Sequence, residues 1–222
     1  MAHTGPTFGI IGTGGFAREV LPVARAFLRH RPELKIEPGR IVFVDRDGGE
    51  PVNAVPVLSE AEFVALEGDR HFALAIGDGS VRQTIAGRLE AAGCLPLSIQ
   101  ADNVLLPEDL DCGPGAVFQP FSMVTADARI GRQFQCNIYA YVAHDCVIGD
   151  YVTFAPRVSL NGNVVVEDHV YVGTGAVIRQ GTADKPLVLG RGCVIGMGAV
   201  VTKDVAPGVT VVGNPARPLE AK

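Results

Sequence analysis

The residue types best suited to chemistry in this 222-residue chain are the neighbouring His144 and Asp145. The unperturbed pKa of an imidazole lies closest to neutral pH, so His144 could take a proton from an attacking amine or hydroxyl. Asp145 could orient the ring or stabilise its charged form, although neighbouring side chains of a strand often diverge. Gly162 follows eighteen residues after His144. A glycine there leaves room for an acyl group, and its N–H could donate to an oxygen on which charge develops. The alternative for His144 is a solvated corner residue or a subunit contact.

Residues eighteen positions apart can meet only if the chain is wound into coils of that length, and the sequence has a matching period. From residue 104 to 203 an apolar residue recurs every six positions, with one slip of five extra residues. A second row, two positions ahead, is apolar throughout except for Ser122. Two inward positions in each six predict short strands joined by tight turns and wound into a parallel β-helix. The main row comprises Leu106, Cys112, Phe118, Val124, Ile130, Cys136, Val142, Ile148, Phe154, Leu160, Val166, Val172, Ile178, Leu189, Ile195 and Val201.

The corners of this coil are predicted from the residues that follow the main row. Glycine follows directly at Gly113, Gly131, Gly149, Gly173, Gly190 and Gly196, where we expect a corner with positive φ. The slip predicts a loop that bulges from the coil over residues 179–186. A second coil histidine, His169, is expected on the surface, because it lies three positions after an inward residue.

Composition excludes several classes of protein. The formal charge of −5 and the lack of a basic cluster argue against a nucleic acid partner. No stretch of about 18 apolar residues predicts a membrane span, and no export signal is expected. Four of the five cysteines occupy inward rows of the coil and none has C-x-x-C spacing, so we expect core thiols, no metal site and a cytoplasmic protein.

The N-terminal half follows a different pattern. Apolar runs at residues 8–11, 41–44 and 72–76 predict strands, and residues 55–57 a short edge strand. Helical patterns cover residues 16–28, 60–66 and 80–92. Strand, glycine turn, helix and strand form a βαβ unit, so we expect a small parallel sheet of Rossmann-like α/β type. The predicted domains are residues 1–100 and residues 101–222, the second being the all-β coil with a C-terminal tail.

One edge of that sheet is predicted to bind a nucleotide. Gly12-x-Gly14-x-x-Ala17 satisfies the loose dinucleotide fingerprint, and Asp45 ends the next strand, where ribose or base recognition usually occurs. Gly77-Asp78 ends the third strand at the same edge. The alternative is that these turns only close a compact βαβ layer. The predicted nucleotide-binding residues are Gly12, Thr13, Gly14, Gly15, Phe16, Asp45, Arg46, Gly77 and Asp78.

Three motifs together resemble a known family: the six-residue coil, the run from Asn137 through His144-Asp145-Cys146-x-Ile148-Gly149-Asp150, and the closing Gly213-Asn214-Pro215-Ala216-Arg217. They resemble left-handed β-helix acyltransferases, and the front end with Gly12-Thr13-Gly14-Gly15 resembles the branch of nucleotide-sugar N-acetyltransferases and related sialic acid O-acetyltransferases. The resemblance covers nearly the whole chain. It implies a left-handed coil, a homotrimer, acetyl-coenzyme A between adjacent coils and an N-terminal domain that holds the nucleotide.

The same resemblance implies roles for individual residues. His144 would take the proton from the sugar amine and Gly162 would bind the acetyl carbonyl. Asp145 stands where the family often has glutamate, which puts its orienting role in doubt. Cations near the slipped loop are candidates for the phosphates of the coenzyme, although ordinary solvated charge is the alternative for each. The predicted coenzyme-binding residues are Asn161, Gly162, Gly173, Thr174, Gly181, Lys185, Lys203 and Arg217.

The resulting hypothesis is an acetyltransferase that acts on the amine of a nucleotide-linked 4-amino-4,6-dideoxy sugar, such as GDP-perosamine or a UDP-4-amino sugar, by direct attack on the thioester. One alternative is O-acetylation of a sialic acid or another sugar. Another is a non-catalytic nucleotide-binding module with the coil as a scaffold. The sequence leaves the base and the sugar open.

Overall fold

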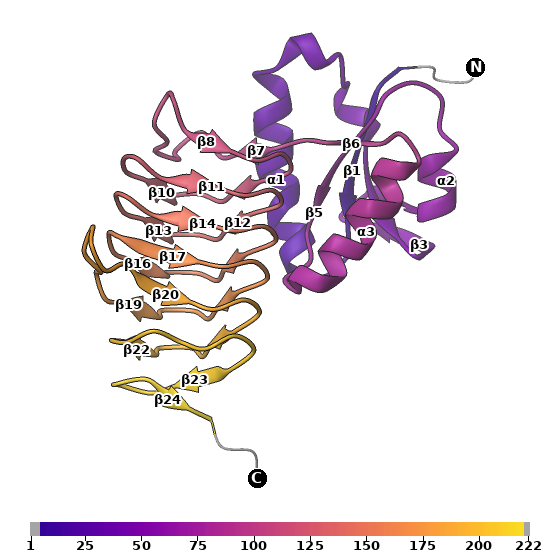
Figure 1. The fold of residues 1–222 in the computed structure, drawn as a ribbon. Coiled ribbons are helices and arrows are strands. Elements are labelled where there is room, and N and C mark those ends of the chain that lie inside the picture. Colours follow the sequence, from indigo (N-terminus) through magenta and orange to yellow (C-terminus); the bar gives the residue numbers. More distant parts are fainter. Residues whose placement is uncertain (1–4, 220–222) are drawn as a thin grey trace.

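The computed structural model describes residues 5–219, which form an N-terminal α/β domain beside a β-helix (Figure 1). The domain has one mixed sheet in the order β3-β4-β2-β1-β5-β6, parallel except for the antiparallel pair β3 and β4. Across residues 5–219, no helix has the length and apolar character needed to cross a bilayer. The elements of the domain are β1 (Thr7–Ile11), α1 (Gly15–Arg29), η1 (Pro32–Leu34), η2 (Pro38–Arg40), β2 (Ile41–Asp45), β3 (Asp47–Val52), β4 (Val55–Ser59), α2 (Glu60–Val64), β5 (Arg70–Leu74), α3 (Gly79–Ala91) and β6 (Leu95–Pro96).

The predicted helices and central strands of this domain are present, but one strand was missed. Residues 55–57 belong to β4, which is internal, because β3 pairs on its outer side. The β3–β4 hairpin turns at Asn53 and Ala54, which both have positive φ. The sequence of β3 includes two glycines and a proline, residues that are depleted in strands, so its pattern did not predict an edge strand.

The second part of the chain is a coil with three sheets, which are parallel except for the last pair, β23 and β24 (Figure 1). Tyr141 pairs with Ser159, and Val147 with Val165, so the coils before the slipped loop have the predicted eighteen residues, whereas pairs that span the loop, such as Val164 with Leu187, include its five extra residues. The strands are β7 (Ile99–Gln100), β8 (Asp111–Cys112), β9 (Val117–Phe118), β10 (Met123–Val124), β11 (Arg129–Ile130), β12 (Gln135–Cys136), β13 (Tyr141–Val142), β14 (Val147–Ile148), β15 (Thr153–Phe154), β16 (Ser159–Leu160), β17 (Val164–Val166), β18 (Tyr171–Val172), β19 (Val177–Ile178), β20 (Leu187–Leu189), β21 (Val194–Ile195), β22 (Val200–Val201), β23 (Thr210–Val212) and β24 (Arg217–Pro218).

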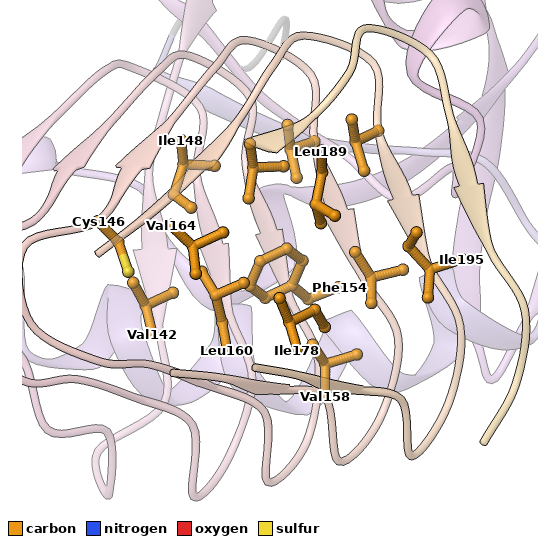
Figure 2. Close-up of a cluster of buried hydrophobic side chains, with 14 of the residues drawn as sticks. Val142, Cys146, Ile148, Phe154, Val158, Leu160, Val164, Ile178, Leu189 and Ile195 are labelled. Atoms are coloured by element: carbon orange, nitrogen blue, oxygen red, sulfur yellow. The ribbon is translucent and has the colours of Figure 1, made fainter. Parts of the chain in front are cut away.

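Side chains from both apolar rows fill the interior of the coil (Figure 2). Phe118, Phe134 and Phe154 form an edge-to-face column with centroid separations of 5.9 and 5.1 Å. Ser122, the polar member of the second row, is buried and donates its hydroxyl to the carbonyl of Gln119 at 2.7 Å. The buried polar group is therefore satisfied, and the interior is otherwise a continuous apolar core that keeps the corners in fixed register.

The prediction that glycines directly after the main row need positive φ was wrong. Positive φ occurs two residues later, at glycine in four of these six corners and at Gln133 and Tyr151 in the other two. The equivalent position of the remaining corners also has positive φ, at Phe121, Asp127, Tyr139, Asp145, Arg157, Asn163 and His169. Gly113 and Gly173 have another reason to be glycine, because a Cβ would lie 2.6 and 2.7 Å from backbone nitrogens of the next coil. Close approach of successive coils, not backbone conformation, selects glycine at these positions.

Buried polar contacts join the two parts of the chain. Arg82 of α3 has no exposed surface and donates to the carbonyl of Gly77 at 2.9 Å and to the hydroxyl of Thr153 at 2.7 Å. Gln135 of the coil donates its amide to the carbonyl of Leu74 at 2.8 Å. Burial lowers the pKa of Arg82 to about 10, well above neutral pH, so the guanidinium stays charged. This network fixes the end of β5 and the start of α3 against the coil.

Candidate active site

His144 lies at an outward corner of the coil, between β13 and β14, with 47% of its side chain exposed. Its Nδ1 is 2.7 Å from Oδ2 of Asp145. The two side chains converge because Asp145 has a φ of 57°, so the chain turns sharply between them. A strand would have directed the neighbours to opposite faces. The geometry therefore allows Asp145 to hold the Nδ1 proton, which leaves Nε2 of the neutral ring as an acceptor.

Gly162 lies against this ring, one coil further on. A Cβ at Gly162 would be 2.5 Å from Nε2 of His144, so only glycine accommodates the imidazole in this position. The stacking follows from the register, since Asn163 donates its backbone N–H to the carbonyl of His144 at 3.0 Å. Among residues 5–219, no group accepts a hydrogen bond from the N–H of Gly162. A basic nitrogen and a free donor thus adjoin each other at one corner.

Asn161, a predicted coenzyme contact, has its amide engaged by the protein. Its Nδ2 donates to the carbonyl of Ile178 at 2.7 Å, and its Oδ1 accepts from the hydroxyl of Tyr141 at 3.1 Å. The side chain therefore braces the corner before Gly162 instead of presenting free groups to a ligand.

The slipped segment forms the predicted loop beside Gly162. Gly181 donates its N–H to the carbonyl of Gly162 at 3.0 Å, and Thr182 and Lys185 close a tight turn. A cavity of about 500 Å³ lies here, lined by Arg179, Gln180, Gly181, Thr182, Lys185, Pro186, Leu187, Thr202, Lys203 and Asp204. Its cations can attract an anionic ligand close to the His144 corner.

Three predicted coenzyme residues lie elsewhere in the chain. Gly173 and Thr174 are at the next corner of the triangle, between β18 and β19, and Arg217 is in β24. A turn of eighteen residues places only one corner in three beside His144, so one copy of the chain does not bring these residues to Gly162.

The N-terminal domain has a separate cavity of about 510 Å³ at the C-terminal ends of its parallel strands. Gly12, Asp45 and Arg46, all predicted, line it, and Gly12 has a φ of 109° that favours glycine. Thr13 donates its hydroxyl to Oδ2 of Asp45 at 2.7 Å, which ties the glycine turn to the end of β2. The cavity is also lined by Ile11, Val44, Glu60, Ile76, Ser80, Val81, Thr84, Ile85 and Arg88.

The other predicted nucleotide-binding residues do not line this cavity, and they lie in different surroundings. Gly14 precedes α1 and Gly15 begins it, in open space, whereas Phe16 packs against the domain core. Asp78 accepts from the N–H groups of Ser80 and Val81, capping α3, and lines a different cavity with Gly77. Gly77 and Asp78 therefore face the coil instead of the cavity at Gly12.

His169 was predicted to lie on the surface, but the structure leaves it only partly exposed. Its ring stacks on Tyr151 at 5.5 Å, and its Nδ1 is buried close to Gly79 at the start of α3. The N-terminal domain covers this corner of the coil. His144 is at another corner, remote from the domain, and in one copy of the chain the two candidate sites are apart (Figure 1).

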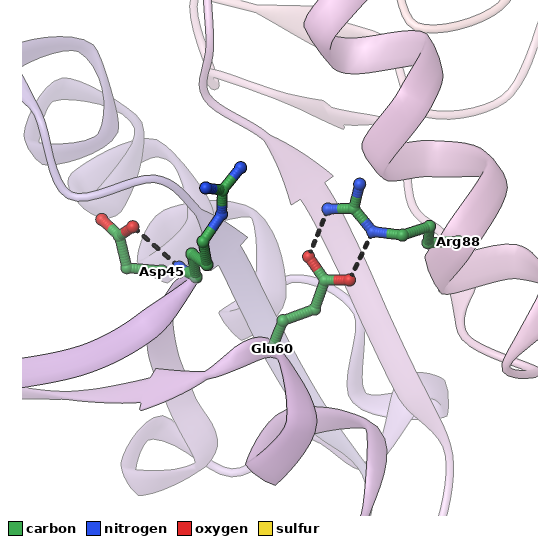
Figure 3. Close-up of polar contacts among 4 residues, drawn as sticks. Asp45, Glu60 and Arg88 are labelled. Atoms are coloured by element: carbon green, nitrogen blue, oxygen red, sulfur yellow. Dashed lines mark hydrogen bonds and ion pairs between the residues drawn. The ribbon is translucent and has the colours of Figure 1, made fainter.

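Sequence reasoning missed Glu60 and Arg88, which form an ion pair in the wall of the N-terminal cavity (Figure 3). Ser59 and Glu62 form a capping box that starts α2, a signal that could have placed Glu60 at a helix N-terminus. Nothing in the sequence pattern places Arg88 opposite it, twenty-eight residues later.

Two further observations bear on chemistry at the His144 corner. Burial raises the pKa of the neighbouring Cys146 thiol to about 11, so it is not a thiolate at neutral pH. A recess of about 410 Å³ adjoins Asp145 and is also lined by Asp109, Asp111 and Asp127, among others. Within residues 5–219, no three His, Cys, Asp or Glu side chains are grouped so that they could hold a metal ion.

Comparisons with known proteins show which family the chain resembles. Residues 8–89 match the family model of the PglD N-terminal domain. The chain is 43% identical to the GDP-perosamine N-acetyltransferase of Escherichia coli O157:H7 over 218 residues, 96% of either chain. WeeI from Acinetobacter baumannii AYE has a TM-score of 0.90 at 44% identity, covering 96% of this chain and 100% of WeeI. A variant of perosamine N-acetyltransferase from Caulobacter crescentus, solved with CoA and GDP-perosamine, has a TM-score of 0.86 at 26% identity and covers 97% of both chains.

These similarities extend over both parts of the molecule. They confirm the predicted fold class, a Rossmann-like domain followed by a left-handed parallel β-helix. They also contradict the alternative of a non-catalytic nucleotide-binding module. The chain belongs to the family of GDP-perosamine N-acetyltransferase and is an acetyltransferase.

Proposed function

We propose that the protein transfers an acetyl group from acetyl-coenzyme A to the 4-amino group of GDP-perosamine or a closely related nucleotide-linked 4-amino-4,6-dideoxy sugar. The observation that carries this proposal is the corner at which His144, held at Nδ1 by Asp145, lies against Gly162. Acetyl transfer to an amine requires a base for the amine proton and a donor for the carbonyl oxygen. This corner offers both groups side by side.

His144 acts as the general base. Its Nε2 accepts the proton that the amine loses as the nitrogen attacks the thioester carbonyl carbon, and the same proton then goes to the departing sulfur. Asp145 keeps the ring in the tautomer with a free Nε2 and stabilises the imidazolium that forms. The shorter arm of aspartate suffices because the positive φ of Asp145 brings the carboxylate back to Nδ1.

The N–H of Gly162 donates to the carbonyl oxygen as negative charge develops on it. Acetyl-coenzyme A supplies the acetyl group as a thioester. Transfer is direct, because the thiol closest in sequence to His144, Cys146, is buried and its pKa is raised to about 11. No residue of the chain therefore needs to carry the acetyl group.

The acidic recess beside His144 supports an amine as the acceptor. Asp109, Asp127 and Asp145 follow one another at intervals of eighteen residues along this corner and line the recess. Their negative potential attracts a protonated amine, which releases one proton to solvent before its nitrogen attacks, and does little for a neutral hydroxyl. This favours N-acetylation over the O-acetylation alternative.

The loop after β19 is the proposed site for the phosphates of the coenzyme. Lys185 and Lys203 line its cavity, and Gly181 is hydrogen-bonded to Gly162, so phosphates bound there would lie near the acetyl-transfer corner. Gly173, Thr174 and Arg217 can contribute only from a second copy of the chain.

Assembly into a homotrimer fits the separation of the two candidate sites. The nucleotide cavity and His144 lie apart in one copy, so the substrate must bridge two copies. A further corner presents an exposed column: Phe121 stacks on Tyr139 with centroids 4.9 Å apart, and Arg157 lies over Tyr139 at 5.5 Å. Exposed aromatic side chains of this kind are enriched at subunit interfaces. Light scattering of the wild type and of Tyr139→Glu measures the assembly, and a monomeric, active wild type would remove the trimer from the proposal.

The test of the function is an acetyl-transfer screen. Release of the free coenzyme A thiol is followed with GDP-, UDP- and dTDP-linked 4-amino sugars and with sialic acid as acceptors. We expect turnover with a nucleotide-linked amino sugar and none with sialic acid. Turnover with sialic acid alone would replace N-acetylation by O-acetylation. The predicted cytoplasmic location stays a prediction.

A further inference from the structure

The N-terminal cavity has apolar walls and a volume that could hold the ring of a nucleotide base. Its volume is about 510 Å³ and its apolar walls come from strand ends and from α3. One wall residue, Val81, is 44% exposed, so apolar surface there is open to solvent until something covers it. Gly12 and Asp45 line the same cavity, which makes it continuous with the glycine turn expected to hold phosphate.

A fixed guanidinium faces this space. Nε and Nη2 of Arg88 donate to the two carboxylate oxygens of Glu60 at 2.8 and 2.7 Å, a bidentate pair. Figure 3 shows the third nitrogen of Arg88, Nη1, directed away from Glu60. Among residues 5–219, nothing accepts a hydrogen bond from Nη1. An arginine has five N–H donors, so this pairing leaves three unused, along the edge formed by Nη1 and Nη2.

The pair is anchored at both ends. Glu60 is the first residue of α2, whose start is held by the capping box of Ser59 and Glu62. Arg88 is in the last turn of α3. Hydrogen bonding to Arg88, the largest influence, lowers the pKa of Glu60, and nearby Arg46 adds to the effect. The carboxylate therefore stays ionised at neutral pH and keeps the guanidinium in one orientation.

We propose that Arg88, oriented by Glu60, reads the base of the nucleotide sugar as guanine, by donating from its free Nη1–Nη2 edge to O6 and N7. This inference rests on the proposed nucleotide-linked acceptor. The purine ring lies against the apolar wall that includes Val81, and the ribose points towards Asp45. Glu60 is a positioning residue in this arrangement, whereas Arg88 contacts the base.

The chemistry of the nucleotide bases makes the free Nη1–Nη2 edge of Arg88 selective for guanine. Guanine presents two acceptors, O6 and N7, at the spacing of two guanidinium N–H groups. Adenine presents a donor beside N7, which opposes the arginine. Uracil and thymine have a single carbonyl at the corresponding edge and no N7. A bidentate contact of this type discriminates by about tenfold or more between a matching and a non-matching base.

Calorimetric titration of nucleoside diphosphates tests the assignment without requiring turnover. GDP, 7-deaza-GDP, inosine diphosphate and UDP are titrated into the full-length protein. The 7-deaza compound lacks only the N7 acceptor, and inosine diphosphate lacks only the 2-amino group. We expect inosine diphosphate to bind like GDP, and 7-deaza-GDP and UDP to bind about tenfold more weakly.

Two variants sharpen the titration. Arg88→Lys keeps a cation opposite Glu60 but removes the fork, so GDP and 7-deaza-GDP should then bind within about twofold of each other. Arg29→Lys, the same change at an exposed position in α1, should leave the wild-type ratio unchanged. If Arg88→Lys does not fold, the wild-type series still decides the question.

The outcomes separate this inference from the proposed function. Equal binding of GDP and 7-deaza-GDP by the wild type, or no binding of GDP, overturns the role of Arg88. Weak binding of inosine diphosphate with normal 7-deaza-GDP binding also overturns it, because Glu60 would then read the 2-amino group. Acetyl transfer to a UDP-linked sugar without a preference for GDP leaves the function and removes the inference. The expected binding pattern without any acetyl transfer would support the role of Arg88 and remove the proposed function.

Discussion

The β-helix and the N-terminal domain position functional groups in different ways. In the coil, hydrogen-bonded register alone places residue n beside residue n + 18, so His144 and Gly162 meet by a fixed repeat. In the domain, Glu60 and Arg88 meet because two helices from distant segments pack at one sheet edge. The coil is therefore suited to hold reacting groups rigidly, while the domain forms a cavity whose lining can vary with the ligand.

The joint between the two parts has features of both. Arg82 comes from the domain, but most of its hydrogen bonds go to residues of the coil. Gln135 comes from the coil and donates to the carbonyl of Leu74 in the domain. A fully buried cation surrounded by oxygen acceptors has little freedom to move. We therefore expect the orientation of the nucleotide cavity to depend on the coil, although the acetyl-transfer corner does not depend on the domain.

The largest effect is expected at His144, the proposed general base in the coil. Replacing His144 by alanine should lower kcat by ~10²–10⁴, about 3–5 kcal/mol of barrier, because proton transfer loses its acceptor. Steady-state kinetics with a nucleotide-linked amino sugar measures the change. His30→Ala, at an exposed pair with Asp102, is the control and should behave as wild type. Near-normal turnover by the His144 variant would remove this residue from the mechanism.

A single methyl group tests the register of the coil. In Gly162→Ala, the new Cβ meets the His144 ring and must displace it, so kcat should fall by about 10–10²-fold with little change in the melting temperature. Gly87→Ala in α3 is the matched control, since nothing lies within 4 Å of a Cβ there. That variant should keep its activity and gain about 0.5–1 kcal/mol of stability. Full activity of Gly162→Ala would mean that the ring position does not matter.

The joint should affect recognition more than chemistry. Arg82→Met removes the donor to the carbonyl of Ile76 and the donor to the hydroxyl of Thr153, so the segment after β5 can shift. We expect the KM for the nucleotide sugar to rise about tenfold, while the KM for acetyl-coenzyme A changes by less than about twofold.

Glu90→Gln weakens another contact across the joint, the ion pair between Arg132 and Glu90, which does not touch Gly77. It should leave both KM values close to wild type, since a part-exposed pair contributes little. Equal changes in both KM values for Arg82→Met would show that the joint only stabilises the fold.

The smallest effect is expected at the thiol beside the active corner. Cys146 is fully buried and its raised pKa keeps it protonated. Cys146→Ala should retain kcat within about twofold, with a modest loss of stability from the small cavity. Mass spectrometry of the wild type after mixing with acetyl-coenzyme A should detect no acetylated cysteine. A loss of turnover comparable to that of His144→Ala would point to a covalent route.

Much of the fold could be predicted because its periods are simple. The six-residue rows define the inward positions of the coil as far as Val201, although Val205 and Val211 extend the core beyond them. Glycine turns and apolar runs define most of the N-terminal sheet. The hairpin strand β3 was missed because Gly48, Gly49 and Pro51 hide an edge strand that is defined only by its pairing with β4. The corner glycines were explained wrongly, since the crowding between coils at Gly113 exists only once the coils are stacked.

Some features of the candidate site could likewise be predicted from the sequence, and others could not. The meeting of His144 and Gly162 followed from arithmetic, but the approach of Asp145 to Nδ1 depended on a left-handed backbone conformation at a residue other than glycine. The location of His169 under the N-terminal domain had no signal in the hexad pattern, which treats all three corners alike.

The amino-acid sequence by itself determined the coil, its register and the meeting of His144 with Gly162, because a short repeat converts directly into distance along one axis. Only the tertiary structure decided which corner the N-terminal domain covers, which cavity contains Asp45 and how Glu60 holds Arg88. Those features depend on contacts between segments far apart in the chain, and packing, not periodicity, sets such contacts.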